Sequence, residues 1–344
     1  MVFYIFFLTF IIILCGRYNI VSGYYIVSKK TGFKLAILFI VIVSCLRFNI
    51  GYDWSVYFSF VYPVYRFQDI GRFEPLSKLI IYCAGVLHQP LILFSVYAIV
   101  TYVNIGIILD TYSEAKFEAL MLYVCFFYLI TLSTIRQAAA VSIVFYGFKY
   151  IDCKKIFKYI LICLFASLFH KTAVIGILFY LLYYFSSIQC FFFLICTYVC
   201  ARILLPAMLK ELAPFFLLYL EKGGVRDSSG SFQRIVYLFM YIYALVFHRK
   251  KMKGILNICM IGVALPFILG GHTGGRLAEY FLIYYCLLIP DCNKRFSIQY
   301  RVLFMIPLYA YFFIYLFFSV FANHSNEYVP FRWYFLENLD QRLM

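Results

Sequence analysis

Long apolar segments recur along this chain, and they constrain its fold more than any other feature. One of them, 91–110 (LILFSVYAIVTYVNIGIILD), carries a single charged residue, which stands at its last position. A helix of roughly 20 such residues is long enough to cross the hydrocarbon core of a bilayer. The apolar runs are continuous and do not alternate with a period of two residues. They therefore predict membrane-spanning helices and not the strands of a membrane barrel.

Composition excludes a water-soluble enzyme. Hydrophobic residues make up 65% of the chain and charged residues 13%, whereas about a quarter of a typical soluble domain is charged. We expect an all-α polytopic membrane protein with about 12 transmembrane helices, within a range of about 10 to 14, and short loops. Residues 1–344 are predicted to form a single integral membrane domain. The expected spans are 2–20, 33–46, 91–110, 117–135, 136–151, 155–170, 171–185, 188–208, 232–248, 254–271, 275–290 and 302–322.

Basic clusters predict the topology. The net charge is +15, and clusters fall at Arg17 to Lys34, Lys149 to Lys158, Arg249 to Lys253 and Lys294 to Arg301. If these clusters are cytoplasmic, as the positive-inside rule favours, an even number of spans places both termini outside. Segment 75–87 is too short to span and is expected to be interfacial or re-entrant, within an outer loop over 47–90. A second outer loop is expected over 209–231. Because membrane orientation explains the basic excess, no nucleic-acid partner is expected.

Polar residues gather on the predicted outer side, beginning where the second span ends. Arg47, Gly51, Asp53 and Tyr57 follow one another there at spacings of four, two and four residues. Arg47 alone is explained equally well as a snorkelling anchor, but Asp53 so close to it weakens that explanation. Glu74 directly precedes the short helix, where it could equally favour the helix N-terminus.

Two bends between predicted spans carry further candidates. Arg136 and Gln137 stand at the junction of two spans, with no Gly, Asn, Asp or Pro to make an ordinary turn. An arginine at membrane depth is a candidate functional residue, and the alanines that follow, Ala138 to Ala140, would allow close approach of a helix or ligand. His170 stands at the next outer bend. A lone histidine is more often structural than functional. Its position on the same side as the other candidates makes His170 a candidate site residue.

A glycine-rich segment, 270–275, precedes Arg276, Glu279 and Tyr280. Glycines that expose backbone N–H groups beside an arginine would make an anion-binding nest, although the segment lacks the spacing of a nucleotide-binding loop. The twelve cysteines show no CxxC pair and no ligand spacing with histidine, so neither disulfides nor a metal site are expected.

Arginines, a histidine and carboxylates at a water–lipid boundary suit a lipid-borne anion. Guanidinium groups bind pyrophosphate and stabilise negative charge on a leaving phosphate. A histidine or carboxylate nearby can take the proton of an attacking hydroxyl.

With these residues in this order, the sequence resembles the EpsG family, Wzy-type polymerases of exopolysaccharide and O-antigen repeat units. The resemblance rests on Arg47-x-x-x-Gly51-x-Asp53-x-x-x-Tyr57, on Glu74, on Arg136-Gln137 and on the Phe169-His170-x-x-Ala173 bend. In the C-terminal half it rests on the layout of the spans and on Arg276 with Tyr280. Lys171-Thr172 stands where many members carry Ser or Thr.

The resemblance implies a metal-independent glycosyltransferase of the GT-C type in the bacterial inner membrane, without cofactors and without nucleotide sugars. It would transfer a growing glycan from polyprenyl pyrophosphate to the non-reducing end of a lipid-linked repeat unit at the outer (periplasmic) face. The resulting hypothesis gives pyrophosphate binding to Arg47, Arg136 and Arg276, and the role of base to His170 or Asp53. Supporting positions are Glu74, Gln137, Tyr57, Glu279 and Tyr280. Expected partners are the polyprenyl-pyrophosphate-linked oligosaccharide, membrane lipids and a chain-length regulator protein.

Two alternatives stay open at this level. An O-antigen ligase shares the donor chemistry but usually has a larger late outer loop than 209–231. A lipid-linked oligosaccharide flippase should carry polar residues at the bilayer midplane and inverted repeats, whereas the charges here lie at one face and no repeat is evident.

Overall fold

The chain is helical throughout its described part. The structure, a computed structural model, describes residues 1–15, 29–61, 73–200, 231–321 and 328–336. Within these ranges the only pairing of extended backbone is one isolated antiparallel bridge, between Arg47 and Trp333. The predicted all-α class is therefore confirmed for the described residues.

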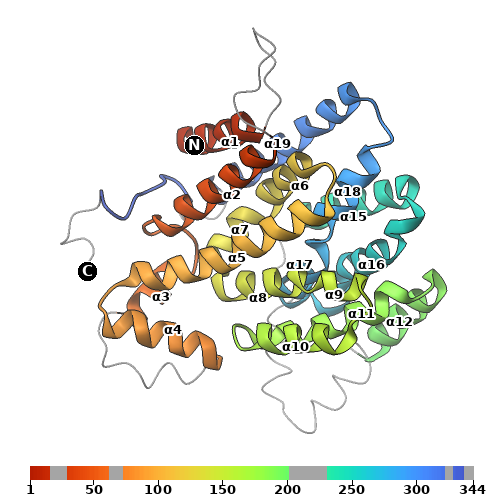
Figure 1. Cartoon of the computed structure of the whole chain (residues 1–344), viewed down its shortest axis with the longest axis horizontal. Coiled ribbons are helices and arrows are strands. Elements are labelled where there is room, and N and C mark those ends of the chain that lie inside the picture. The colour runs from red at the N-terminus through yellow and green to blue at the C-terminus, as the bar shows by residue number, and fades with distance from the viewer. Residues whose placement is uncertain (16–28, 62–72, 201–230, 322–327, 337–344) are drawn as a thin grey trace. The chain divides into compact units, whose positions relative to one another are not determined.

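The chain folds into two compact units (Figure 1). The first comprises Met1–Tyr146, Ile162–Val174 and Phe296–Met344, and the second comprises Gly147–Leu161 and Ile175–Arg295. In the first unit lie α1 (Val2–Cys15), α2 (Lys29–Cys45), α3 (Trp54–Val61), α4 (Pro75–Val86), α5 (Pro90–Tyr112), α6 (Lys116–Tyr123), the π-helical turn η2 (Val124–Tyr128), α7 (Leu129–Ser133), α8 (Ile135–Tyr146) and α19 (Ile298–Phe321). In the second lie α9 (Phe148–Asp152), α11 (Leu178–Tyr184), α12 (Ser187–Val199), α15 (Ser231–Phe247), the 3-10 turn η5 (Lys250–Met252), α16 (Lys253–Leu269), α17 (Gly271–Leu282) and α18 (Tyr285–Asn293). The helices α10 (Ile156–Ser167) and η3 (Lys171–Ile177) each contribute residues to both.

Helix α5 is central to the first unit, where it packs against α2 on one side and α8 on the other (Figure 1). Small residues allow both contacts. A Cβ added at Gly106 would lie 3.1 Å from the Ile37 side chain, so glycine brings α5 close to α2. On α8 the alanines 138–140 are buried. They perform the packing role expected of small residues between membrane helices.

The segment α6–η2–α7 runs from Lys116 to Ser133 and is the most buried of the candidate membrane spans. Its middle turn is π-helical, which places one extra residue in the turn. The helix stops at Thr134, whose backbone is not helical (φ −95°, ψ 50°), and α8 begins at the next residue. The predicted junction without a polar loop in front of Arg136 is therefore confirmed.

Four described helices are long and apolar enough to cross a membrane: Pro90–Tyr112, Lys116–Ser133, Lys250–Leu269 and Gln299–Phe317. Seven shorter apolar helices accompany them, and Pro75–Val86 is one of these, as predicted for the segment too short to span. Exposed apolar side chains on the short helices, such as Phe6 on α1 (69% exposed) and Phe239 on α15 (67%), suit contact with lipid and not with water. A multi-pass membrane protein follows from these helices.

Several boundaries differ from prediction. The span expected over 275–290 is two helices, α17 and α18, because the chain turns at Ile283 and Tyr284. The span expected over 136–151 is likewise divided at Gly147. Residues 54–61, expected to lie in an outer loop, form the helix α3. The expected outer loop 209–231 lies outside the described residues, apart from its last position.

The glycine-rich segment forms the start of a helix, and its predicted role as an anion-binding nest stays a prediction. The chain turns at Gly270 (φ +86°), and α17 begins at Gly271 and runs back along α16. A Cβ at Gly274 would lie 2.4 Å from the backbone oxygen of Leu265, beside Pro266. The glycine is therefore needed for close packing of the two helices at the proline.

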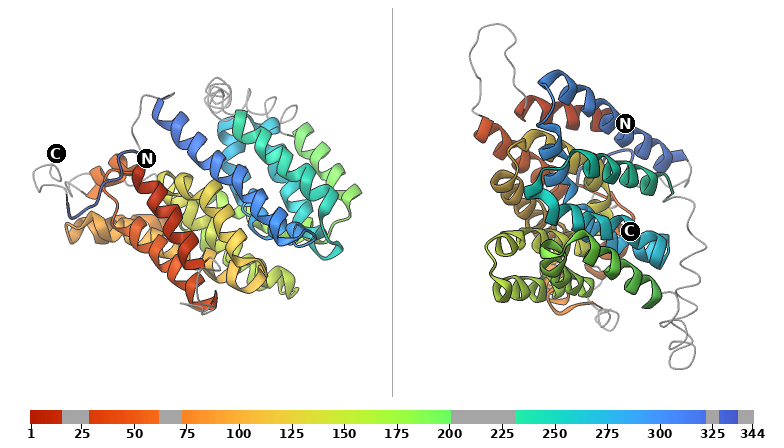
Figure 2. Two further views of the ribbon diagram at one scale, coloured as in Figure 1. Left: turned by 90° about the horizontal axis from the view of Figure 1, so that it is seen from above. Right: turned by 90° about the vertical axis from the view of Figure 1, so that its right-hand side faces the viewer.

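The two ends of the first unit meet. The Phe3 ring stacks on Phe331 with centroids 3.8 Å apart, and the Tyr4 hydroxyl donates to the backbone oxygen of Tyr328 at 3.0 Å. The ribbon of Figure 2 shows the start of the chain beside the dark blue C-terminal segment. The start of α1 and residues 328–336 therefore lie at the same end of the unit. The number of membrane crossings, and the side that this end faces, stay predictions.

We expect Gly274→Ala to lower the stability of the protein by about 1–3 kcal/mol, because the new methyl group overlaps the α16 backbone. Gly275→Ala is the matched control. A Cβ there meets nothing within 4 Å, so it should be neutral or stabilise by about 1 kcal/mol through helix propensity. Thermal unfolding of both variants in detergent measures the difference. Equal melting temperatures would contradict the packing role.

Candidate functional site

The loop after α2 is fastened to the break between α7 and α8. The Arg47 guanidinium is 2% exposed and donates to three backbone oxygens: Ser44 (2.8 Å), Leu132 (3.2 Å) and Ile50 (3.3 Å). It also lies over the Phe94 ring, 5.2 Å from its centroid. Carbonyl groups at a helix end lack partners within the helix, so a buried arginine can satisfy them. The prediction that Arg47 binds pyrophosphate finds no support in this geometry, which gives it a structural role.

Gly51 completes the fastening. Its backbone has φ +102°, and a Cβ there would lie 2.4 Å from the Leu132 oxygen. Only glycine fits this conformation and this approach without strain. The next N–H, that of Tyr52, donates to the Ser133 hydroxyl at 3.0 Å. The sequence motif that begins at Arg47 thus binds the loop after α2 to the last turn of α7.

The C-terminal segment 328–336 holds the same loop from the other side. The Phe48 N–H donates to the Arg332 oxygen (3.0 Å), and the Tyr334 N–H donates to the Leu46 oxygen (2.8 Å). The hydroxyl of the buried Tyr328 lies 2.6 Å from that of Ser133. Loop 46–52, the end of α7 and this segment therefore form one hydrogen-bonded assembly directly before α8.

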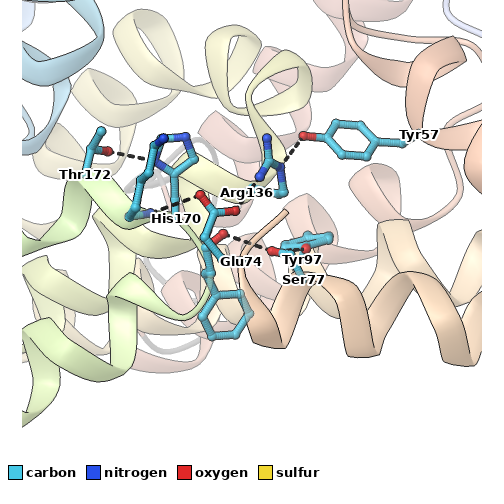
Figure 3. Close-up of polar contacts among 9 residues, drawn as sticks. Tyr57, Glu74, Ser77, Tyr97, Arg136, His170 and Thr172 are labelled. Atoms are coloured by element: carbon cyan, nitrogen blue, oxygen red, sulfur yellow. Dashed lines mark hydrogen bonds and ion pairs between the residues drawn. The ribbon is translucent and has the colours of Figure 1, made fainter. Parts of the chain in front are cut away.

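Arg136 lies in the first turn of α8, directly after this assembly, which therefore fixes its position. Its Nε donates to the Tyr57 hydroxyl on α3 at 2.7 Å, and its Nη1 lies 2.5 Å from Oε2 of Glu74 (Figure 3). The guanidinium lies over the Phe73 ring, 4.5 Å from the centroid. The Arg136 side chain is 19% exposed and that of Glu74 11%. The ion pair is therefore mostly shielded from water but reachable from one side.

Glu74 also links the α4 end to the bend that carries His170. Its Oε1 accepts the backbone N–H of Lys171 at 3.1 Å. It occupies the N-cap position of α4 but does not cap the helix with its side chain, so the predicted helix-end role is replaced by this bridge. One carboxylate therefore holds both Arg136 and the 3-10 turn η3 in place.

Helix α4 meets the C-terminal end of α10 directly. The Leu76 N–H donates to the Leu168 oxygen (3.1 Å), and the Ser77 hydroxyl donates to the Phe169 oxygen (2.9 Å). Tyr97 on α5 donates in turn to Ser77 (2.9 Å; Figure 3). First-turn donors of α4 thus bond to backbone oxygens of the turn that directly follows α10. The backbone on the N-terminal side of His170 is fixed from two helices.

The His170 ring is oriented by a neighbour within the same bend. Its Nδ1 lies 2.6 Å from the Thr172 hydroxyl, and the ring is half-buried. Figure 3 shows the side chains of His170, Glu74, Arg136 and Tyr57 converging from four separate segments.

Four of the predicted site residues are therefore brought together: Tyr57, Glu74, Arg136 and His170. Asp53 stands directly before α3, one helical turn ahead of Tyr57, whose N–H bonds to the Asp53 backbone oxygen. Gln137 is buried on α8. The remaining predicted residues, Arg276, Glu279 and Tyr280, lie on α17 in the second unit; Arg276 is exposed and Tyr280 is buried.

Sequence reasoning missed several members of the cluster. They are Phe73, Ser77, Tyr97 and Tyr328, and the three aromatic residues gave no distinctive signal among 41 phenylalanines and 34 tyrosines. Ser77, a hydroxyl in the otherwise apolar run PLSKLIIYCAGV, is the one of them that could have been singled out. Among the described residues no group of three His, Cys, Asp or Glu side chains could hold a metal ion.

Comparison with known proteins gives one match. The model of the EpsG family matches residues 30–333, which include every residue of the cluster. No curated protein and no solved structure matches the chain.

Glu74→Gln should weaken the contacts that hold the cluster together. The amide keeps an acceptor but loses the charge that pairs with a largely buried Arg136, and a hydrogen bond to a charged group contributes about 1.5–3 kcal/mol. We expect a fall in stability of that order, measured by thermal unfolding in detergent. Asp152→Asn removes an exposed carboxylate and serves as the control. An unchanged melting temperature for Glu74→Gln would show that the ion pair does not hold the cluster together.

Proposed function

Because the chain belongs to the EpsG family, we propose that it polymerises lipid-linked repeat units of an exopolysaccharide or O-antigen. Family membership itself indicates a membrane protein of exopolysaccharide biosynthesis. The finer proposal is transfer of a growing glycan from polyprenyl pyrophosphate to the non-reducing end of a lipid-linked oligosaccharide. The reaction would take place at the outer face of the bacterial inner membrane, and it would use neither a metal nor a nucleotide sugar.

The observation that carries this proposal is the Arg136–Glu74–His170 cluster. A partly exposed guanidinium, fixed by a phenol and a carboxylate, stands beside a histidine that a hydroxyl orients. Such an arrangement supplies both requirements of glycosyl transfer to a hydroxyl: a cation for the departing pyrophosphate and an acceptor for a proton.

In the proposed reaction the acceptor hydroxyl attacks the anomeric carbon and inverts it in a single displacement. The bond from that carbon to the phosphate oxygen breaks, and its electron pair leaves with the pyrophosphate, which Arg136 stabilises. In the tautomer whose Nδ1–H donates to Thr172, Nε2 carries the lone pair that would take the hydroxyl proton. Asp53 stays the second candidate for the base.

The other predicted arginines enter the proposal differently. Arg276 is proposed as a second pyrophosphate ligand, with Glu279 and Tyr280 supporting it. Arg47 is assigned an indirect role, since its donors are bonded to backbone oxygens and it acts by holding the break before Arg136. Gln137, buried beside Arg136, supports the start of α8.

The proposal includes the predicted setting of the enzyme. We propose about 12 membrane spans in a GT-C-like architecture, with both termini outside. The partners are the polyprenyl-pyrophosphate-linked substrates, membrane lipids and a protein that regulates chain length.

Arg136→Ala should abolish polymer formation, because loss of one donor to a developing negative charge costs about 100- to 1,000-fold in rate. The test is in vitro polymerisation of a purified lipid-linked repeat unit, combined with surface polysaccharide from cells deleted for the native gene. Arg332→Ala, at an exposed arginine, is the control. Normal polymer from well-expressed Arg136→Ala protein would refute the assignment. Loss of attachment to lipid A with normal chain length would indicate a ligase, and substrate retained on the inner leaflet would indicate a flippase.

His170→Gln should slow the in vitro reaction by about 100- to 10,000-fold, the usual contribution of a general base. Asp53→Asn is compared in the same assay. A large loss in His170→Gln with a small one in Asp53→Asn would support His170 as the base, and the reverse result would transfer the role to Asp53.

A further inference from the structure

The Tyr57 hydroxyl bonds to Arg136 through its oxygen, which leaves its proton for a second hydrogen bond. The phenol oxygen accepts the Nε–H of Arg136 at 2.7 Å, and the residue is only 5% exposed. A tyrosine hydroxyl can accept and donate at the same time. Among the described residues none accepts the Tyr57 proton. Buried polar groups nearly always find partners, so a donor left in this position is a candidate for binding a ligand.

The phenol keeps that proton under physiological conditions. Tyr57 lies on α3, outside the candidate membrane-spanning helices. Burial raises the pKa of its hydroxyl, and Asp53 and Glu74 raise the pKa further, whereas Arg136 lowers it in part. The group is therefore a donor, and not a phenolate, when a ligand arrives.

Arg136 has unused donors at the same place. Its guanidinium has five N–H groups, of which Nε serves Tyr57 and Nη1 serves Glu74. Within the described part of the chain Nη2 has no partner, and the side chain is 19% exposed. The open edge of Arg136 and the Tyr57 O–H thus belong to one hydrogen-bonded pair, and among the described residues neither meets an acceptor.

We propose that the Tyr57 hydroxyl and the open edge of Arg136 together bind one phosphate group of the lipid pyrophosphate. The inference rests on the proposed function and adds to it a second ligand-binding residue. The two groups that this inference uses are both donors, and the unbridged oxygens of a phosphate are acceptors that could bind to both at once. A sugar hydroxyl would use one such donor but gains less from the guanidinium.

The test is direct binding of polyprenyl pyrophosphate to the purified full-length protein in nanodiscs. Tyr57→Phe keeps the ring and removes the hydroxyl, and we expect binding about 10- to 100-fold weaker, as for one hydrogen bond to a charged group. Tyr52→Phe, at an exposed tyrosine in the same loop, is the matched control and should bind as the wild type does. The melting temperature of each variant shows whether it is folded.

Tyr57 could also weaken binding simply by ceasing to hold Arg136. Replacing it with p-aminophenylalanine separates the two effects, because the amino group donates well and accepts poorly. Recovery of binding relative to Tyr57→Phe supports the donor role. Binding as weak as that of Tyr57→Phe would overturn it, and assign Tyr57 to positioning Arg136.

Two further outcomes would also decide the question. If Tyr57→Phe binds the pyrophosphate as tightly as the wild type, the inference is wrong, although the polymerase assignment stands as long as Arg136→Ala loses activity. A neutral polyprenol-linked sugar is the second probe. An equal loss of affinity for it would show that Tyr57 faces the sugar and not the phosphate. Failure of the wild-type protein to polymerise lipid-linked repeat units would instead refute the proposed function itself.

Discussion

The contact between Arg47 and the end of α7 is the interaction on which the rest of the cluster depends. A helix that stops at Ser133 leaves carbonyl oxygens without partners in an apolar setting, where each unsatisfied group costs free energy. Arg47 supplies a donor to Leu132, and Gly51 brings its own backbone against the same turn. Because α8 starts one residue after the break, the position of Arg136 is set by how that break is held.

Glu74 makes the second set of contacts that hold the cluster together. Its two oxygens bond to α8 and to the His170 bend, while the first turn of α4 bonds to two backbone oxygens in the turn after α10. The short helix that is too short to span the bilayer is thus joined end to end with another helix. This joining explains why an acidic residue precedes Pro75, a proline that starts a helix without needing a side-chain cap.

Much of the fold and of the candidate site could be predicted from the sequence. Most of the parts that could not be predicted depend on contacts between residues far apart in the chain. Long apolar runs and the lone polar pair Arg136–Gln137 predicted the helices and the break, since both depend on local composition. Position on the predicted outer side indicated Glu74 and His170 as candidates, and the family resemblance added Tyr57. The sequence could not show that Arg47 bonds to backbone carbonyl groups, because an arginine with that role and one that binds a ligand have the same sequence pattern.

The bridge from Arg47 to Trp333 joins residues far apart in the chain, and no local pattern predicts such a pairing. Helix α3 was missed because its eight residues, WSVYFSFV, are aromatic or β-branched in large part and favour strands or loops.

The pairing of Arg136 with Glu74 has a consequence for selectivity. An arginine that already has a carboxylate partner presents an almost neutral site to the surrounding water, so charge alone gives a passing anion little reason to stay. Inorganic phosphate, abundant and small, brings nothing else. A lipid-borne pyrophosphate also brings a second phosphate, a sugar and a chain anchored in the same bilayer, each of which adds contacts. In the proposed reaction the neutral pair would therefore favour a lipid-borne pyrophosphate over the commonest competing anions, without any part of the protein having to exclude them.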